Sequence, residues 1–341
     1  MLRGGTASCR WVLGLFVAVS AAAQMTEPAS GAGQAEGEYR APRTPDGQPD
    51  IQGFWSNQTY TPLERREGVT ATFYTPEELA EIEGGAAVRE SALTEPGTIP
   101  DVHYDFTQFG LDRSQAARAE NRRTSLIVDP PDGRLPPVNA AGELLAAERA
   151  EAQAKLGGRW DSAEANQLDD RCIIMRGVGP PMMASGYNSN YHIVQAPGHV
   201  MILSEMIHDA RIISIDDNAD QVPAGLRQWI GVSRGHWEGE TLVVETSNFN
   251  AKNPFQGSSD QLTVTERFTR IADDVIRYSF TVDDPGTWGR PWTVETPIQR
   301  SRGPLFEFAC HEGNYGLYNT LVGARLEEQR AAEAETESRD R

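Results

Sequence analysis

A histidine with charged neighbours suggests acid–base chemistry around residue 208. Glu205, His208 and Arg211 flank one tight connection between expected strands, so their side chains could converge. A histidine beside a carboxylate is the commonest general acid or base near neutral pH. We therefore expect His208 to take a proton, Glu205 to orient it and Arg211 to stabilise negative charge.

Two further histidines have a similar setting at expected strand ends. His236 stands two residues before Glu238, and His311 is followed by Glu312 and Tyr315. His236 is the alternative proton acceptor, and His311 and Tyr315 complete the candidate catalytic set. The competing interpretation is that such side chains are solvated or complete turns, because strand ends are exposed in most folds.

No metal or other cofactor is expected. Adjacent His311 and Glu312 on a strand would point to opposite faces, so they could not bind one ion together. A dispersed site formed by His208, His236 and His311 is the alternative. The sequence contains no P-loop, dinucleotide-binding glycine pattern, haem-attachment cysteine pair or metalloprotease helix.

Ser233 lies in a Gly-x-Ser-x-Gly pattern that resembles a hydrolase nucleophile elbow. That elbow requires a strand that turns sharply into a helix. Here His236 and Trp237 follow and lead into a Glu-Gly-Glu turn and another strand. The context therefore argues against Ser233 as a nucleophile.

Aromatic side chains in the same region are candidates for ligand contact. Flat rings bind sugars and planar organic molecules, but they also fill protein cores, and both interpretations remain open. The candidates are Tyr191, Trp229, Trp237 and Trp292.

Most of these candidate residues lie in a region whose sequence pattern is typical of β-strands. Short segments with alternating apolar and polar residues are separated by Gly, Pro, Asn or Asp, which predicts antiparallel strands with one buried face. The sequence thus predicts a mainly β fold, an antiparallel meander closed as a barrel or folded as a sandwich. The nine segments are 191–195, 199–206, 210–215, 228–237, 241–246, 261–269, 275–282, 292–298 and 305–310.

A helical insertion precedes this region. Thr75 and Glu78 form a capping box around Pro76, which predicts a helix near residues 76–92. Asn139 caps a second helix near 140–156, which two glycines end. Short strands are expected at 51–55 and 125–128. We expect one domain over residues 41–325, followed by a charged tail at 326–341.

The N-terminus predicts export. Residues 1–23 combine two arginines, a ten-residue apolar run and a small-residue cleavage site, as in signal peptides, and a flexible leader follows to residue 40. The run is too short to span a membrane, which takes about 20 residues. Cleavage leaves Cys172 and Cys310, and an even pair in an exported chain predicts a disulfide, with two free thiols as the alternative. The expected location is therefore periplasmic or secreted.

Charge limits the partners. The formal net charge is −18. Strong acidity disfavours nucleic acid and anionic membranes. A small-molecule ligand or substrate is the expected partner.

Several phrases of the sequence resemble a large family of exported bacterial proteins without an assigned function. These phrases are RTPDGQPDIQGFW from residue 43, SLIVDPPDGRLPP from 125, GHWEGETLVVETSNFN from 235 and TVTERFTR from 263. The resemblance implies export and one integrated fold. Separately, Gly53-Phe54-Trp55 is similar to the Gly-x-Trp of lipocalin-like barrels, in which the tryptophan packs across one barrel end. This second resemblance implies a lipocalin-like barrel.

Two function hypotheses follow. The first is an exported hydrolase or lyase that acts on a small organic molecule or glycoside by His/Glu acid–base chemistry. The second is a non-catalytic, lipocalin-like carrier of a small apolar or aromatic ligand. An enzyme needs His, Glu and Arg side chains that converge, whereas a carrier needs a mainly apolar lining. A structural envelope protein, which would lack a pocket, is a third possibility.

Overall fold

The computed structural model describes residues 39–93, 117–175, 177–184, 188–215, 223 and 225–339. The expected signal peptide and nearly all of the expected leader lie outside these residues. Within them, no helix is both long and apolar enough to cross a membrane.

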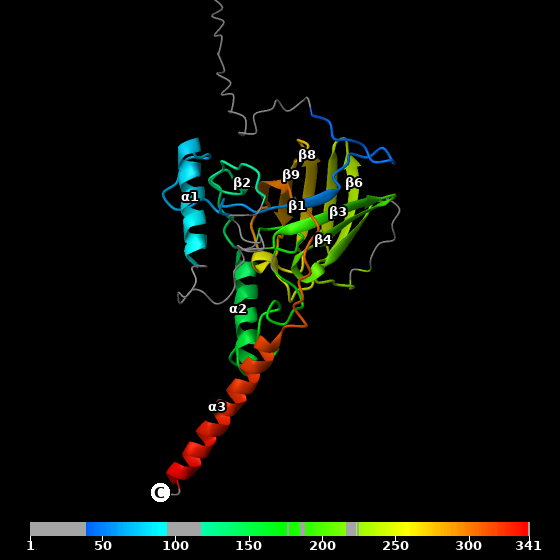
Figure 1. The fold of residues 1–341 in the computed structure, drawn as a ribbon. Helices are drawn as coiled ribbons and strands as arrows, with labels where there is room; N and C mark the ends of the chain where they lie inside the picture. The colour runs from blue at the N-terminus through cyan, green and yellow to red at the C-terminus, as the bar shows by residue number, and fades with distance from the viewer. Residues whose placement is uncertain are drawn as a thin grey trace, which may run out of the picture.

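The fold is a closed β-barrel with helices on one side and at one end (Figure 1). Nine strands form the closed barrel, and β2 (Ile127–Asp129) pairs with the start of β10, on the edge whose other end pairs with β1. The order around the ring is β1 (Gly53–Ser56), β3 (Asn190–Ala196), β4 (His199–Ser204), β5 (Ala210–Ser214), β6 (Val232–Glu238), β7 (Thr241–Ser247), β8 (Thr263–Arg270), β9 (Val275–Asp283) and β10 (Trp292–Arg300).

Strand β1 closes the ring because it pairs on both edges. Trp55 is opposite Tyr191 of β3 and opposite Arg300 of β10, both in antiparallel register. The Trp55 ring is fully buried inside, and its indole nitrogen donates to Ile51 O at 3.0 Å. The prediction of a mainly β, lipocalin-like barrel with helical elements is confirmed.

One seam departs from the expected antiparallel meander. Strands β5 and β6 run parallel and share a single paired position, Ser214 with Arg234. The strands cross closely here because Gly235 faces inward without a side chain. A Cβ atom at Gly235 would lie 2.8 Å from Ile215 Cδ1 and 3.0 Å from Ile213 Cγ2.

The barrel interior is filled by alternating apolar residues, as one buried face of a pleated sheet requires. Strand β9, for example, places Ile276, Tyr278, Phe280 and Val282 inside. Burial of these side chains removes apolar surface from water and stabilises the closed form. The interior is therefore a packed core, and a ligand chamber must be sought elsewhere in the described structure.

Helices α1 (Pro76–Leu93) and α2 (Ala140–Lys155) occupy the two expected positions. The Thr75 and Glu78 side chains bond each other's backbone N–H groups at 3.2 and 2.8 Å, as a capping box does. Asn139 Oδ1 accepts from Gly142 N at 2.9 Å at the start of α2. The start of each helix could therefore be predicted from residues that form local capping hydrogen bonds.

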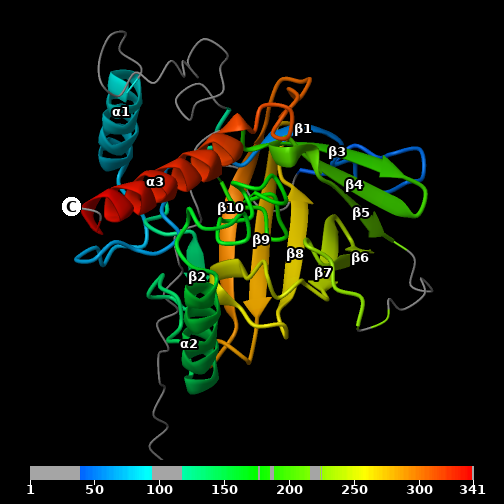
Figure 2. The same ribbon diagram turned by 90° about the horizontal axis from the view of Figure 1, so that it is seen from below.

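The C-terminal region differs from expectation. Residues 305–310, expected as a strand, are irregular, because Pro304 lacks an N–H and Phe306 N donates to the Glu205 side chain rather than to a neighbouring strand. Helix α3 (Tyr315–Arg339) then projects away from the barrel, with the C-terminus near its far end (Figures 1 and 2). The domain boundary expected at residue 325 falls inside this helix.

The expected disulfide is present. Cys172 and Cys310 are bonded, with their Cα atoms 5.8 Å apart and a sequence separation of 138 residues. The bond ties the segment after α2 to the segment that leads into α3. Asn314 reinforces this junction by donating to Asp170 O at 2.9 Å.

Candidate functional site

A buried ion pair lies inside the barrel. Arg211 of β5 and Glu266 of β8 both point inward, and Arg211 donates to the two carboxylate oxygens at 2.5 and 3.3 Å. Glu266 is fully buried and Arg211 nearly so. Tyr278 donates its hydroxyl to the same carboxylate at 2.8 Å. A buried ion pair of this kind is tolerated because the opposite charges attract and the carboxylate oxygens accept hydrogen bonds.

A short segment covers this cluster, and we call residues 177–184 the plug segment. Met182 N donates to the Tyr278 hydroxyl at 2.9 Å, and the Tyr191 hydroxyl donates to Gly177 O at 2.6 Å. The Met182 side chain belongs to the barrel core. Burial is the main cause that raises the pKa of both tyrosines above the ordinary value for a phenol. Two neutral phenols therefore hold the plug segment on the barrel.

The other side of the plug segment lines a large open groove. Its volume is about 1150 Å³, enough for a small organic molecule. Its walls come from the last turns of α2, residues 164–184 and residues 249–257. The apolar lining consists of Ala152, Leu156, Leu168, Ile174, Met175, Pro180, Pro181, Met183, Ala184, Phe249, Ala251, Pro254 and Phe255.

Polar contacts fix the groove walls in place. Arg149 of α2 crosses to the 249–257 wall and donates to Gly257 O and Ser258 O, each at 2.8 Å. Gln153 Nε2 donates to Ala165 O at 3.1 Å on the other wall. The 164–184 wall is further tied by the disulfide at Cys172. The groove is thus bounded by anchored segments.

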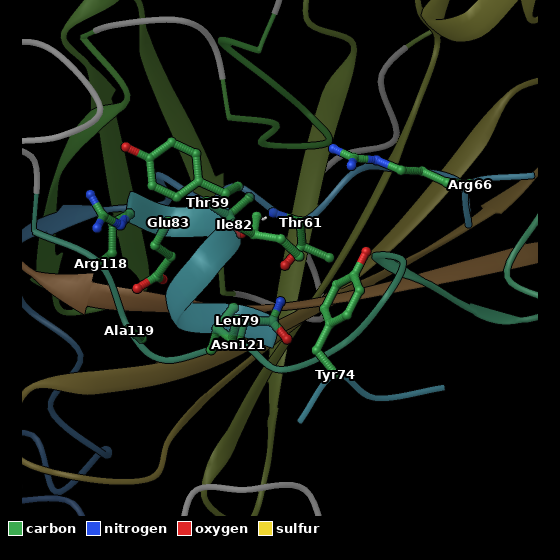
Figure 3. A pocket seen from close by; sticks show the side chains of 11 residues that line it. Thr59, Thr61, Arg66, Tyr74, Leu79, Ile82, Glu83, Arg118, Ala119 and Asn121 are labelled. Atoms are coloured by element: carbon green, nitrogen blue, oxygen red, sulfur yellow. Dashed lines mark hydrogen bonds between the residues drawn. The ribbon is translucent and has the colours of Figure 1, made fainter. Parts of the chain in front are cut away.

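A second cavity lies between α1 and the loop at residues 59–61, with Arg118 and Asn121 on its rim (Figure 3). Leu79, Ile82 and Glu83 of α1 face it. Its free volume is about 10 Å³, which is about the size of one water molecule. It is too small for an organic ligand, so the groove is the better candidate site.

Comparisons of the chain with protein-family models, with curated proteins and with solved structures returned no match. The site is therefore interpreted from its own residues.

The three candidate catalytic histidines are exposed and do not meet. His236 lies on the outer face of β6, and its Nε2 is 3.1 Å from Glu238 Oε1, while Glu238 Oε2 accepts from Arg267 at 2.6 Å. The Arg267 hydrogen bond, followed by that of His236, lowers the pKa of Glu238. His208 is exposed in η2 (Met206–His208), and His311 is exposed before α3. In the described residues, no cluster of three or more His, Cys, Asp or Glu side chains could hold a metal ion.

The remaining nominated catalytic residues also have other partners. Glu205 is buried and accepts from Asn190 Nδ2 at 2.7 Å and from Phe306 N at 3.1 Å. Its carboxylate therefore holds two other segments of the chain and does not orient His208. Arg211 is bound to Glu266, as described above. Tyr315 is 71% exposed at the first turn of α3. The structure therefore does not assemble the expected acid–base set.

The nominated aromatic residues do not line the groove. Tyr191 and Trp292 are buried in the barrel, and Trp229 and Trp237 are half-buried. Trp292 lies directly behind the groove, however, because its ring stacks on Phe255 with centroids 6.0 Å apart. Ser233 is buried in β6 with its hydroxyl 2.8 Å from Thr246 Oγ1, in a strand-to-strand context that provides no elbow.

Sequence reasoning missed Glu266 and the groove. Glu266 occupies the inward position between Val264 and Phe268, and a carboxylate inside an apolar alternation was the signal that could have revealed it. The groove walls offer no such signal, because residues 164–175, 177–184 and 249–257 contain no strand or α-helix and their positions depend on tertiary contacts.

Proposed function

We propose that the protein is a non-catalytic carrier that binds a small organic molecule with a mainly apolar body. The supporting observation is the groove beside the plug segment, whose lining combines thirteen apolar side chains with ten polar or charged ones. Ligand sites commonly have this composition, in which apolar surface supplies affinity and polar groups fix orientation. The half-buried Phe255 ring offers a flat surface for an aromatic or aliphatic body.

The geometry favours a carrier over the hydrolase or lyase hypothesis. Acid–base catalysis needs its groups within hydrogen-bond reach of one substrate. His208, His236 and His311 are exposed on separate elements, and the buried Arg211 and Glu266 satisfy each other. None of these five residues lines the groove.

The carrier would act outside the cytoplasm, in the periplasm or after secretion. This part of the proposal rests on the signal-like N-terminus and on the disulfide, since such bonds persist in oxidising compartments.

A neutral fluorescent probe tests the proposal. Phenylnaphthylamine should bind the purified mature protein and brighten as it leaves water. Ala152→Trp would place a large ring in the groove from α2 and should weaken binding at least about 10-fold. Ala147→Trp is the matched control, because Ala147 is exposed on the same helix but does not line the groove.

Native mass spectrometry of protein purified from an exporting host is an independent test of ligand binding, since a retained ligand would add a defined mass. The proposal fails if phenylnaphthylamine does not bind, or if Ala152→Trp and Ala147→Trp bind it as the wild type does.

A further inference from the structure

We infer that the ligand of the groove carries an acidic group, a carboxylate or sulfonate, at one end of its apolar body. The inference rests on the proposed carrier function and adds the chemical class of the ligand. It starts from the charged side chains that line the groove, which are Arg149, Glu164, Asp169, Arg171 and Lys252.

One of the three cations is already used by the fold. The Arg149 guanidinium donates to three backbone carbonyls, those of Ala251, Gly257 and Ser258. Its burial lowers its pKa, although the charges of Asp284 and Asp260 oppose this effect. Arg149 therefore joins the walls and is not free to bind a ligand.

The other two cations are available. In the described part of the chain, neither the Arg171 guanidinium nor the Lys252 ammonium group has a hydrogen bond or ion pair. Arg171 is half-buried in the 164–184 wall, and Lys252 is exposed in the 249–257 wall. A ligand between the walls thus meets a cation on each.

Two acids also line the groove. Asp169 Oδ1 accepts a hydrogen bond from Asp170 N at 3.0 Å, while Glu164 is exposed. With Arg149 bound to backbone carbonyls, two cations and two acids remain in the lining, so the inference rests on the positions of Arg171 and Lys252 and not on net charge. Their unpaired charges, one on each wall, attract a negative group at short range even in a chain whose formal net charge is −18.

A pair of probes that differ by one acidic group tests this inference. Anilinonaphthalene sulfonate has the skeleton of phenylnaphthylamine plus a sulfonate. The wild type should bind the sulfonate probe about 10-fold more tightly than the neutral probe.

Charge-removing variants locate the effect. Arg171→Gln and Lys252→Gln should each weaken binding of the sulfonate probe about 3- to 5-fold more than they weaken binding of the neutral probe. Lys155→Gln is the matched control. Lys155 is the only other lysine of the chain, lies at the end of α2 outside the groove lining and pairs with Glu151 at 2.8 Å.

Lysine chemistry provides a second readout. Because the chain has two lysines, acetylation by a water-soluble reagent can be followed at each by peptide mass spectrometry. The bound sulfonate probe should protect Lys252 and leave the acetylation of Lys155 unchanged.

The outcomes separate the two proposals. Equal binding of both probes, unchanged by Arg171→Gln and Lys252→Gln, overturns the acidic-ligand inference and leaves the carrier proposal standing. Failure of both probes, or binding that Ala152→Trp does not weaken, overturns the carrier proposal and the inference with it.

Discussion

The Arg211 guanidinium and the Glu266 carboxylate meet inside the barrel, with Arg211 NH1 2.5 Å from Glu266 Oε2 and both side chains shielded from water. The pair joins β5 to β8, which are not neighbours in the ring. It therefore spans the interior beside the weakest seam, where β5 and β6 share one paired position.

Removing one partner of this pair should be costly. Arg211→Met leaves the Glu266 charge buried with only the Tyr278 hydroxyl, and we expect a loss of about 3–5 kcal/mol in the free energy of unfolding. The double variant with Arg211→Met and Glu266→Leu should lose less than Arg211→Met alone, because no unpaired charge remains. Urea unfolding measures both.

An exposed ion pair is the control for this prediction. Arg290 NH2 lies 2.7 Å from Asp129 Oδ2, and both side chains are about half exposed. Arg290→Met should cost less than about 1 kcal/mol. Equal losses for Arg211→Met and Arg290→Met would contradict the assigned role of the buried pair.

Stability should fall in alkaline solution because of two buried tyrosines. Burial raises the pKa of Tyr191 and Tyr278 in the folded protein, and the nearby Glu266 charge adds to the shift of Tyr278. In the unfolded chain both phenols titrate near pH 10. Above that pH the unfolded state has lost these protons while the folded state retains them, so unfolding becomes more favourable.

The effect has a defined sign and size. The stabilisation is fully present below about pH 10 and is lost as the pH rises, by about 1.4 kcal/mol per pH unit for each tyrosine. Urea unfolding midpoints measured across this range should fall less steeply for Tyr278→Phe than for the wild type. Tyr318→Phe, at a position exposed on α3, should leave the slope unchanged. Parallel slopes for Tyr278→Phe and the wild type would refute the prediction.

Much of the barrel could be predicted because its strands have a simple signal. In β9, every second residue from Ile276 to Val282 is apolar and buried, and this alternation needs no knowledge of the partner strand. The capping residues Thr75 and Asn139 likewise act through local hydrogen bonds. The Cys172–Cys310 bond followed from compartment and cysteine count.

The candidate site could not be predicted in the same way. Candidate residues chosen by residue type were exposed histidines. The buried polar group is Glu266, which was not predicted because it lies among apolar residues on the inward face of its strand. The groove depends on long-range contacts, such as Arg149 with Ser258, that no local pattern encodes. The start of helix α3 was missed because its first turns, from Tyr315, contain glycines and the first turn has no acidic residue.

Reduction of the disulfide should loosen the plug segment. Cys172 lies five residues before Gly177, whose carbonyl accepts from Tyr191, and its bond to Cys310 fixes the near end of that wall. Replacing both cysteines by serine should lower the free energy of unfolding by about 2–5 kcal/mol, because the open chain regains the freedom that the cross-link removes. Limited proteolysis should then cut within residues 173–184 sooner than elsewhere in the domain. The wild type treated with reductant should show the same early cut, whereas the oxidised wild type should resist it. An unchanged cleavage pattern after reduction would mean that the two hydrogen bonds from Tyr191 and Met182 hold the plug segment without the cross-link.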